Sequence, residues 1–296
     1  MKQSKAIKYL FIINSGSGTN PATHWEEQVR AYFDKSGDSY AIFVLPEKID
    51  VKEIENKLAI TKPQNLVAVG GDGTITMLAK MVEGTDTALG IIPAGSANGM
   101  AKELGIPEDA TAAMNVISAG KTRPSDLIKI NDHYCLHLSD LGLNAQLVKY
   151  FSEGKLRGKL GYARVILKTL YHKQKMLVDI QAAGKQIKQE SFMIAFANAK
   201  KYGTGAVINP EGKTDDGSFE LIIVKKLRFG ALLRMLFKPG RFNPKNIEII
   251  SCTQAVINTK HPVHFQVDGE YIGKEKKVIA EIRKNVLLLI LPDASL

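Results

Sequence analysis

A short apolar strand signal that ends in a glycine-rich turn is the feature that most restricts the fold of this chain. In residues 65–80, NLVAVGGDGTITMLAK, the apolar run Leu66–Val69 stops at Gly70 and Gly71, and a helix-like pattern follows. Glycine lets backbone N–H groups approach a ligand closely, and a helix N-terminus attracts anions. The turn therefore predicts either a phosphate-binding loop or a plain turn with a helix cap.

The first 125 residues repeat this order of strand and helix. Strand signals cover residues 7–13, 40–45, 66–69 and 88–92, and helical signals cover residues 21–35, 51–58, 75–82 and 97–104. Alternation with short connections predicts an α/β domain with a parallel sheet and helices on both faces. A sheet of this kind binds ligands beyond the carboxyl ends of its strands.

Two further small-residue loops follow strands of the same predicted sheet. They are IINSGSG at residues 12–18 and GIIPAGSANGMAKELGIP at residues 90–107. Three such loops at one sheet edge favour a nucleotide site over three unrelated turns. Neither a P-loop nor a G-x-G-x-x-G dinucleotide fingerprint occurs in the chain, so those two kinds of nucleotide site are not supported.

Strand signals dominate from about residue 126. They predict a second domain over residues 126–284 that is mostly antiparallel, of the sandwich or barrel kind, interrupted by one basic helical segment at about 158–173. The first domain is predicted to cover residues 1–125. The order of the domains alone does not decide which sheet the final strand signals join. We expect residues 285–296 to return to the first sheet.

The net charge of +10 is concentrated in two segments. Residues 149–175 hold eight Lys or Arg and one acid, and residues 225–245 hold seven and no acid. Concentrated positive charge favours an anionic partner, although a solvated basic face explains such a segment equally well. No RNA-binding or zinc-finger signature supports nucleic acid as that partner.

Cysteine content and hydropathy favour a cytoplasmic protein. Cys135 and Cys252 lie in separate strand-like contexts, which predicts buried free thiols in a reducing compartment. No apolar run approaches the ~18 residues of a membrane-spanning helix.

The motifs together resemble the diacylglycerol kinase catalytic family, which includes bacterial lipid kinases and sphingosine kinases. GGDGT at 70–74 and PAGSAN at 93–98 carry the resemblance, and NSGSG at 14–18 corresponds to the family's first loop. Later landmarks follow in order and extend the resemblance over nearly the whole chain: SDLIKIN, DLGLNAQLV, LRGKLGYARVILKTL, FMIAFANAKKYGTGAVINPEGKTDDGSFELIIV and VHFQVDGEYIG. GGDGT alone is ambiguous, because NAD kinases also carry it.

The resemblance implies an α/β ATP-binding domain plus a β-sandwich domain, with ATP and a lipid hydroxyl held in the cleft between them. The implied activity is transfer of the γ-phosphate of ATP to a lipid alcohol, with Mg²⁺. Asp72 is implied to hold the catalytic magnesium. The implied nucleotide-binding residues are Asn14, Ser15, Gly16, Ser17, Gly18, Gly70, Gly71, Asp72, Gly73, Thr74, Ile75, Thr76, Ser96 and Asn98.

Phosphoryl transfer to an alcohol needs a carboxylate that accepts the hydroxyl proton. Asp268-Gly269-Glu270 follows a strand, and Asp-Gly by itself is an ordinary hairpin turn signal. The resemblance makes this turn the carrier of the catalytic base, with Asp268 and Glu270 both open as candidates. It also implies a structural magnesium on Asp216 with the carbonyls of Lys213 and Ser218, an oxygen set that suits this ion.

Five positions depart from the family pattern. Ser15 replaces a Pro, Thr76-Met77 replaces the usual Asn-Glu, Gly99 replaces an Asp, and Ser96 replaces a Thr. Two alternatives therefore remain open: an NAD kinase-like phosphotransferase, and a nucleotide-binding member with weak or lost catalysis. We expect ATP and a lipid as ligands, peripheral contact with an anionic membrane and a possible homodimer. The lipid acceptor is left open among diacylglycerol, phosphatidylglycerol and a sphingoid base.

Overall fold

The computed structural model of the chain separates into two compact units. Unit 1 comprises Met1–Ser125 and Asn285–Leu296, and unit 2 comprises Asp126–Lys284. The structure describes residues 7–16, 18, 20–46, 48–153, 174–199, 201–202, 206–207, 209, 212–226 and 245–293.

A parallel sheet forms the centre of unit 1. Its strand order is β4 (Ala88–Pro93), β3 (Asn65–Gly70), β1 (Tyr9–Asn14) and β2 (Tyr40–Leu45). Near its C-terminal end, β16 (Glu270–Ile290) adds a parallel pairing to β4 through Leu288 and Leu289. The strands are continuous apolar runs because helices cover both faces of the sheet.

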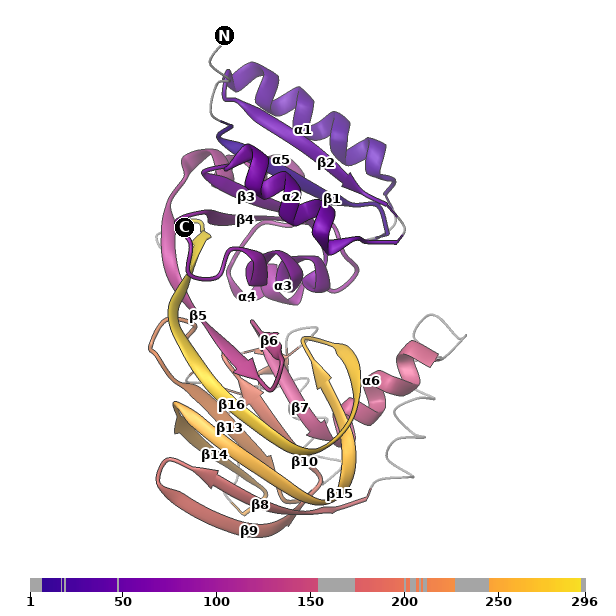
Figure 1. Ribbon diagram of the computed structural model, residues 1–296, viewed down its shortest axis with the longest axis vertical. Helices are drawn as coiled ribbons and strands as arrows, with labels where there is room; N and C mark the ends of the chain where they lie inside the picture. The colour runs from indigo at the N-terminus through magenta and orange to yellow at the C-terminus, as the bar shows by residue number, and fades with distance from the viewer. Residues whose placement is uncertain are drawn as a thin grey trace. The chain divides into compact units, whose positions relative to one another are not determined.

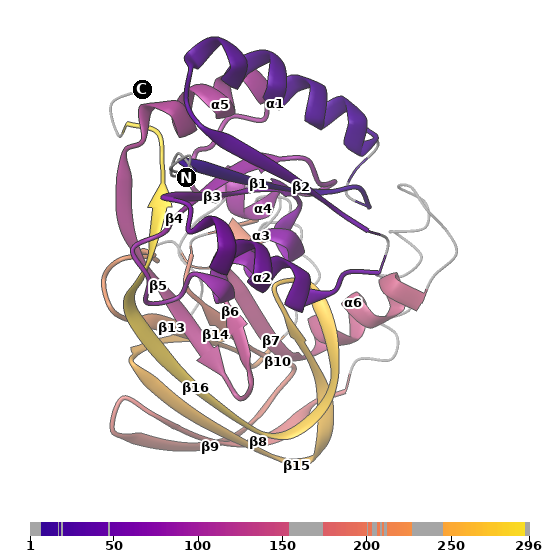
Figure 2. The same cartoon turned by 45° about the horizontal axis from the view of Figure 1, so that its top comes forward.

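Five helices surround this sheet (Figures 1 and 2). They are α1 (Ala22–Ser36), α2 (Val51–Thr61), α3 (Asp72–Met81), α4 (Gly99–Glu103) and α5 (Ala110–Ala119). α1 and α5 lie on one face, and α2 and α3 lie on the other. α1 buries Trp25, Val29 and Phe33, which recur every four residues and so share one side of the helix. The predicted α/β class is confirmed, whereas α5 was not predicted.

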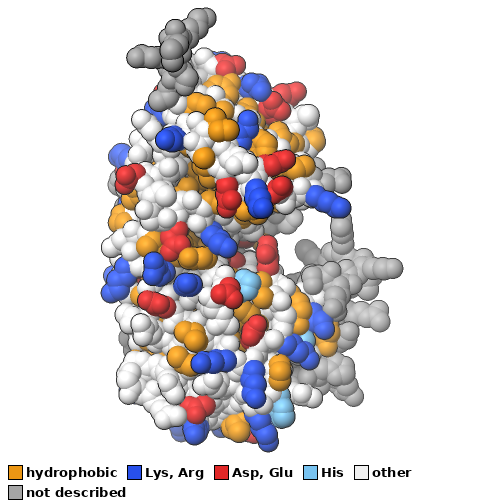
Figure 3. Space-filling view, in the orientation of Figure 1, with side chains coloured by type: hydrophobic (Ala, Val, Ile, Leu, Met, Phe, Trp, Pro, Cys, Tyr) orange, Lys and Arg blue, Asp and Glu red, His pale blue; other side chains and the backbone are white. Residues whose placement is uncertain are grey.

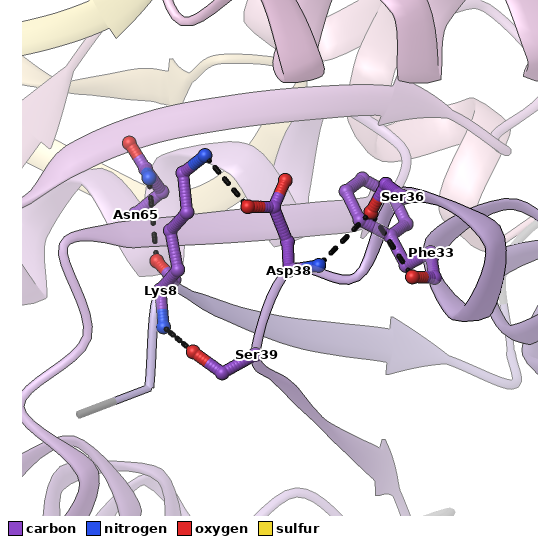
Figure 4. Close-up of polar contacts among 6 residues, drawn as sticks. All are labelled: Lys8, Phe33, Ser36, Asp38, Ser39 and Asn65. Atoms are coloured by element: carbon purple, nitrogen blue, oxygen red, sulfur yellow. Dashed lines mark hydrogen bonds and ion pairs between the residues drawn. The ribbon is translucent and has the colours of Figure 1, made fainter. Parts of the chain in front are cut away.

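Polar contacts close the amino ends of three strands (Figure 4). The Lys8 N–H donates to Ser39 Oγ at 3.1 Å, and Lys8 Nζ pairs with Asp38 Oδ1 at 2.9 Å. The Asn65 side chain donates to the Lys8 carbonyl at 3.2 Å. These contacts hold the starts of β1, β2 and β3 together, at the edge of the sheet opposite the glycine-rich loops.

Unit 2 is built from antiparallel strands (Figure 1). The main path runs β14 (Ile247–Cys252), β13 (Phe219–Val224), β10 (Met193–Ala197), β7 (Leu138–Gly142), β15 (Gln254–Val267) and β16, and β15 also pairs with β8 (Met176–Ala182). The remaining elements are β5 (Thr122–Ile130), β6 (His133–Cys135), β9 (Lys185–Ser191), β11 (Lys201–Tyr202), β12 (Ala206–Val207) and α6 (Leu143–Glu153). A buried cluster that includes Phe196, Phe219 and Phe265 forms the core.

Several boundaries differ from the sequence prediction. The separate strand signals at 255–258 and 263–267 form one strand, β15, with an irregular register between Asn258 and Val263. The signals at 277–282 and 286–291 likewise merge into β16. The predicted basic helix at 158–173 lies entirely outside the described residues, as does most of 225–245. Among the helices that are described, none combines the length and apolar character needed to cross a membrane.

Candidate active site

The three glycine-rich loops of unit 1 converge at one edge of the sheet. They follow β1, β3 and β4, which are neighbouring parallel strands, so their carboxyl ends lie side by side. The Ala94 N–H donates to the Gly70 carbonyl at 3.0 Å and joins the second and third loops directly.

The loops approach so closely that side chains would not fit at two glycines. A Cβ on Gly95 would lie 2.5 Å from the Cα of Gly71, and a Cβ on Gly18 would lie 2.3 Å from the Ala94 carbonyl oxygen. Distances under 3.0 Å do not occur for real Cβ atoms. The glycines thus serve the packing of one loop against another, which three unrelated turns would not require.

The N-terminus of α3 offers backbone donors at this edge. α3 begins at Asp72, and its first internal bond is donated by the Ile75 N–H to the Gly71 carbonyl at 3.1 Å. The N–H groups of Asp72, Gly73 and Thr74 precede that bond, so the helix itself supplies them with no acceptor. Three donors and the positive end of a helix dipole form a site that suits a phosphate group.

The Thr74 hydroxyl is held by Asn14. Asn14 Nδ2 donates to Thr74 Oγ1 at 2.8 Å, and Asn14 Oδ1 accepts the Gly16 N–H at 3.0 Å. Because Thr74 Oγ1 accepts from Asn14, its own proton is directed to another acceptor. A side chain on β1 and one on α3 are therefore fixed together, although 60 residues separate them.

Asp72 connects the second loop to the third. Its Oδ2 accepts the Gly99 N–H and its Oδ1 accepts the Met100 N–H, each at 2.9 Å. The start of α4 is thereby capped by a side chain, whereas no side chain in the described ranges caps the N-terminus of α3. Each carboxylate oxygen has a second lone pair, so these bonds leave room for a metal contact.

The other predicted nucleotide-binding residues occupy different surroundings. Asn98 Oδ1 accepts the Gly95 N–H at 2.9 Å and so shapes the third loop, while the Ser15 hydroxyl donates to the Leu45 carbonyl at 3.1 Å. The side chain of Ile75 is buried, that of Thr76 is half-buried and that of Ser96 is exposed. Ser17 lies outside the described residues.

In unit 2, Asp268 is engaged by backbone groups. Its carboxylate accepts the N–H groups of Leu136, His137 and Leu138 at 2.8 to 3.0 Å, and the Cys135 thiol lies 3.4 Å away. The residue has φ of 46°, in the left-handed region. The carboxylate thus anchors the segment between β6 and β7, and most of its acceptor capacity is used there.

Glu270 has the opposite surroundings. It is exposed, and its carboxylate has no hydrogen bond or ion pair with any residue in the described ranges. It stands one residue after Gly269, at the first position of β16. Of the two carboxylates in this turn, Glu270 is the one available to accept a proton from a ligand.

A buried pair that sequence reasoning missed supports this turn. Gln266 Nε2 donates to Asp140 Oδ2 at 2.5 Å, and Gln266 Oε1 accepts the Gly269 N–H at 2.7 Å. Asp140 and Gln266 are almost fully buried. The sequence signal for this pair was Asp140, a carboxylate within the apolar run of β7, because a buried charge needs hydrogen-bond partners.

Hydrogen bonds also hold the turn that was predicted to bind a structural magnesium. Asp216 Oδ1 accepts the N–H and hydroxyl of Ser218, and the buried Asp126 accepts the Gly217 N–H at 2.7 Å. Asp216 Oδ2 and the carbonyls of Lys213 and Ser218 are hard oxygen donors that fit Mg²⁺ with several waters. No cluster of three or more His, Cys, Asp or Glu suited to a metal occurs among the described residues.

Both cysteines are buried free thiols, as predicted. Burial raises the pKa of Cys135 well above its ordinary value, and the nearby Asp268 carboxylate raises it further. Burial also raises the pKa of Cys252 to about 12, with a smaller contribution from Glu220. Neither thiol has the character of a nucleophile at neutral pH.

Two family models match the chain. The diacylglycerol kinase catalytic domain matches residues 8–130, and the YegS C-terminal NAD kinase beta sandwich-like domain matches residues 140–291, which is half of the chain. The chain therefore belongs to the diacylglycerol kinase catalytic domain family, in the group with a YegS-type C-terminal domain.

Individual relatives agree with this assignment. A protein named diacylglycerol kinase from Bacillus subtilis (strain 168) is 26% identical over 271 residues, covering 88% of this chain and 89% of its own. A protein named "Probable lipid kinase YegS-like" from Yersinia enterocolitica is 28% identical over 256 residues, covering 83% and 85%. The relatives are named as kinases, and the chain is a member of a lipid kinase family.

Solved structures share the fold. The crystal structure of a diacylglycerol kinase from Bacillus anthracis str. Sterne aligns with a TM-score of 0.77 at 20% identity, covering 99% of this chain and 100% of that chain. At this identity the likeness concerns the fold alone. The predicted fold class, an α/β domain followed by a β-sandwich domain, is confirmed.

Proposed function

We propose that this protein is an ATP-dependent lipid kinase that transfers the γ-phosphate of ATP to a lipid hydroxyl. The observation that carries the proposal is the convergence of three glycine-rich loops at the start of α3, where the helix itself provides no acceptor for its first N–H groups. Family membership supports the reaction class. ATP supplies the phosphoryl group, and bound Mg²⁺ would neutralise charge on it.

Each residue has a defined task in this proposal. The N–H groups of Gly73 and Thr74 bind phosphate oxygens, and Asn14 orients the Thr74 hydroxyl toward them. Asp72 would hold the catalytic magnesium through its remaining lone pairs, and Asp216 with two carbonyls would hold a structural one.

Glu270 is the proposed general base. Its carboxylate takes the proton of the lipid hydroxyl as that oxygen attacks the γ-phosphorus. The bond from the γ-phosphorus to the bridging oxygen breaks, and ADP leaves. Asp268 is a positioning residue, because its carboxylate holds the 136–138 backbone beside the turn.

Phosphate transfer from radiolabelled ATP tests the proposal. The acceptors are diacylglycerol, phosphatidylglycerol, sphingosine and NAD, each with the wild-type chain and with Glu270→Gln. A labelled lipid that depends on Glu270 supports the lipid kinase. Labelled NADP would instead favour the NAD kinase-like alternative, and ATP binding without any product would leave a nucleotide-binding protein.

We also propose that the enzyme works from the cytoplasm as a peripheral membrane protein. The basic segments 149–175 and 225–245 support this, and each basic side chain near an anionic surface contributes about 1 kcal/mol. Sedimentation with liposomes should show binding that rises with anionic lipid, falls in high salt and weakens in Arg234→Gln with Lys238→Gln. Equal binding to neutral vesicles at all salt concentrations would contradict the electrostatic part.

A further inference from the structure

Asp140 on β7 and Gln266 on β15 form a buried polar pair with no assigned task in the proposed reaction. The two residues stand opposite each other in the antiparallel ladder, so strand register places their side chains together. Lys, Arg, Asp and Glu side chains are spread over the visible surface of unit 2 (Figure 3), whereas Asp140 is 0% exposed and Gln266 is 1% exposed. Burying a charge is costly, and apolar residues of similar volume often stabilise a fold equally well. Stability alone therefore does not explain this pair.

The amide of Gln266 joins a carboxylate on one side to a backbone N–H on the other. Nε2 donates to Asp140 Oδ2, and Oε1 accepts the Gly269 N–H at 2.7 Å. The reversed amide would turn its oxygen toward the carboxylate and its NH₂ toward the N–H, so these contacts fix one orientation. Position 266 therefore requires one donor and one acceptor, which an amide supplies and a carboxylate or a thioether does not.

The turn that Gln266 holds is a two-residue hairpin turn. β15 and β16 pair up to the residues that flank Asp268 and Gly269, and both turn residues have positive φ, 46° and 86°, as in a type I′ turn. The ladder itself supplies no acceptor for the N–H groups of these two residues. The Asp268 N–H donates instead to the Leu138 carbonyl at 2.9 Å. The Gly269 N–H reaches Asp140 through Gln266, so both turn N–H groups are linked to β7.

The turn determines where the proposed base stands. Glu270 directly follows Gly269, and its exposed carboxylate makes no hydrogen bond or ion pair with any residue in the described ranges. The backbone of the turn therefore sets the position from which Glu270 reaches a ligand. Because a displacement of about 1 Å can lower a rate by about 10²-fold, a rotated Gly269 peptide would slow proton transfer.

The same carboxylate also holds the first turn of α6. Asp140 Oδ1 accepts the Ala145 N–H at 2.8 Å, and Oδ2 accepts the Asn144 side chain at 2.6 Å. These donors are the second and third residues of the helix, which packs against β7 and β15. A displacement of the start of α6 thus moves Asp140 and, through Gln266, the acceptor of the Gly269 N–H.

We propose that Asp140 and Gln266 are positioning residues that act on phosphoryl transfer through Glu270, and that they couple the position of this base to the first turn of α6. The assignment rests on the proposed role of Glu270 as the general base. Both side chains are buried, so they act on the turn and not on a ligand.

Gln266→Met removes both contacts and keeps a side chain of similar size. It should lower kcat about tenfold through the displaced base and leave KM for ATP unchanged. Transfer from radiolabelled ATP measures this with whichever of diacylglycerol, phosphatidylglycerol and sphingosine the wild-type chain labels most. The matched control is Thr259→Val, which removes a buried hydroxyl of β15 that donates to the His261 carbonyl at 2.8 Å. Unchanged kcat in Gln266→Met, or an equal loss in the control, would overturn the positioning role.

Exchanging the two side chain types tests the link by rescue. Asp140→Asn alone leaves Ala145 or Gln266 without an acceptor, and Gln266→Glu alone places two carboxylates in contact. In the double variant, the amide at 140 donates to the carboxylate at 266, which still accepts the Gly269 N–H, and the net charge is unchanged. Each single variant should lose kcat, and the double variant should recover most of it. A double variant as slow as the single variants would overturn the link.

The Glu270→Gln background separates positioning from a general loss of structure. If Gln266 acts only through the base, Gln266→Met should not lower the residual kcat of Glu270→Gln any further. A further tenfold loss would overturn the positioning role. Normal turnover in Glu270→Gln by itself would instead overturn the proposed base, and the positioning role with it.

Hydrogen exchange tests the coupling to α6 without turnover. NMR follows the N–H groups of Gly269 and Ala145 separately. Asn144→Ala should speed exchange at Gly269, and Gln266→Met should speed exchange at Ala145, because coupling between two sites is reciprocal. Thr259→Val should change neither rate. If each variant affects only the N–H group nearest to it, the coupling is overturned. This result is decided even if the wild-type chain labels no lipid, an outcome that would overturn the lipid kinase and the positioning role.

Discussion

The carboxylate of Asp72 and the backbone N–H of Gly99 are joined by a hydrogen bond of 2.9 Å. The other oxygen of Asp72 binds the Met100 N–H in the same way. The residue proposed to hold magnesium therefore also fixes the third loop relative to the second. Loop geometry and metal binding depend on one side chain, so substitutions there change both.

Asp72→Asn should abolish phosphoryl transfer and lower the free energy of unfolding by about 1 kcal/mol, the usual cost of a lost helix cap. An amide has one acceptor oxygen, so one of the two N–H groups loses its partner. Transfer assays and urea unfolding measure the two effects.

Asp109→Ala is the matched control for the lost cap at Asp72, because alanine has no side-chain acceptor. Asp109 caps α5 by accepting the Ala112 N–H at 2.8 Å and lies in none of the three loops. The substitution should lower the free energy of unfolding by a similar amount and leave phosphoryl transfer unchanged. If the Asp72 variant keeps full activity, Asp72 has no metal or catalytic role.

Glu270 and Asp268 should respond differently to neutral substitution. Glu270→Gln should lower turnover by roughly 10²–10⁴-fold through loss of the base, with ATP affinity and stability unchanged. Asp268→Asn should lower the free energy of unfolding by about 1–3 kcal/mol, because buried N–H groups lose an acceptor. Normal turnover in the Glu270 variant would place the base elsewhere.

Gly95→Ala should weaken ATP binding. The added methyl would lie 2.5 Å from the Gly71 Cα, so the second and third loops must separate. Gly16→Ala lies in the first loop, but its methyl would meet Asn14 Oδ1 at 3.4 Å, so its effect should be small. Calorimetric titration with an ATP analogue compares them, and equal affinity in both variants would argue against close loop packing as a requirement.

Cys252 should make the protein less stable at alkaline pH. Its pKa is raised from 9.0 to about 12 by burial, so the folded state retains a proton that the unfolded state has already lost. The stabilisation from the neutral thiol is complete below pH 9 and is lost as the pH rises toward 12, at up to about 1.4 kcal/mol per pH unit. Urea unfolding of wild type and Cys252→Ala between pH 8 and 11 measures this. Parallel pH profiles of the free energy of unfolding for the two proteins would contradict the raised pKa of Cys252.

Local patterns predicted the elements of unit 1 well. β2 begins at Tyr40 and ends at Leu45 as expected, and α2 begins at Val51. Both follow from apolar periodicity that a short window contains. β9 was missed because its strand is largely polar, which is typical of a strand at the edge of a sheet.

Motifs predicted which residue types would meet in the site, but not how each is used. Asp268 and Glu270 look equivalent in the sequence, as two carboxylates around one glycine. The structure distinguishes them, because the backbone of residues 136–138 engages Asp268 and leaves Glu270 in solvent. That contact spans about 130 residues, and no local pattern encodes it.

The sequence by itself determined the class of the fold, the family and the position of the loops after β1, β3 and β4. These depend on chain order, apolar periodicity and glycine spacing, which are local properties. Only the tertiary structure decided that Asp72 caps α4, that Gln266 links Asp140 to the Gly269 turn, and that Asp140 also holds the start of α6. Each of these depends on strand register and loop packing between distant segments, which long-range burial sets after the local elements have formed.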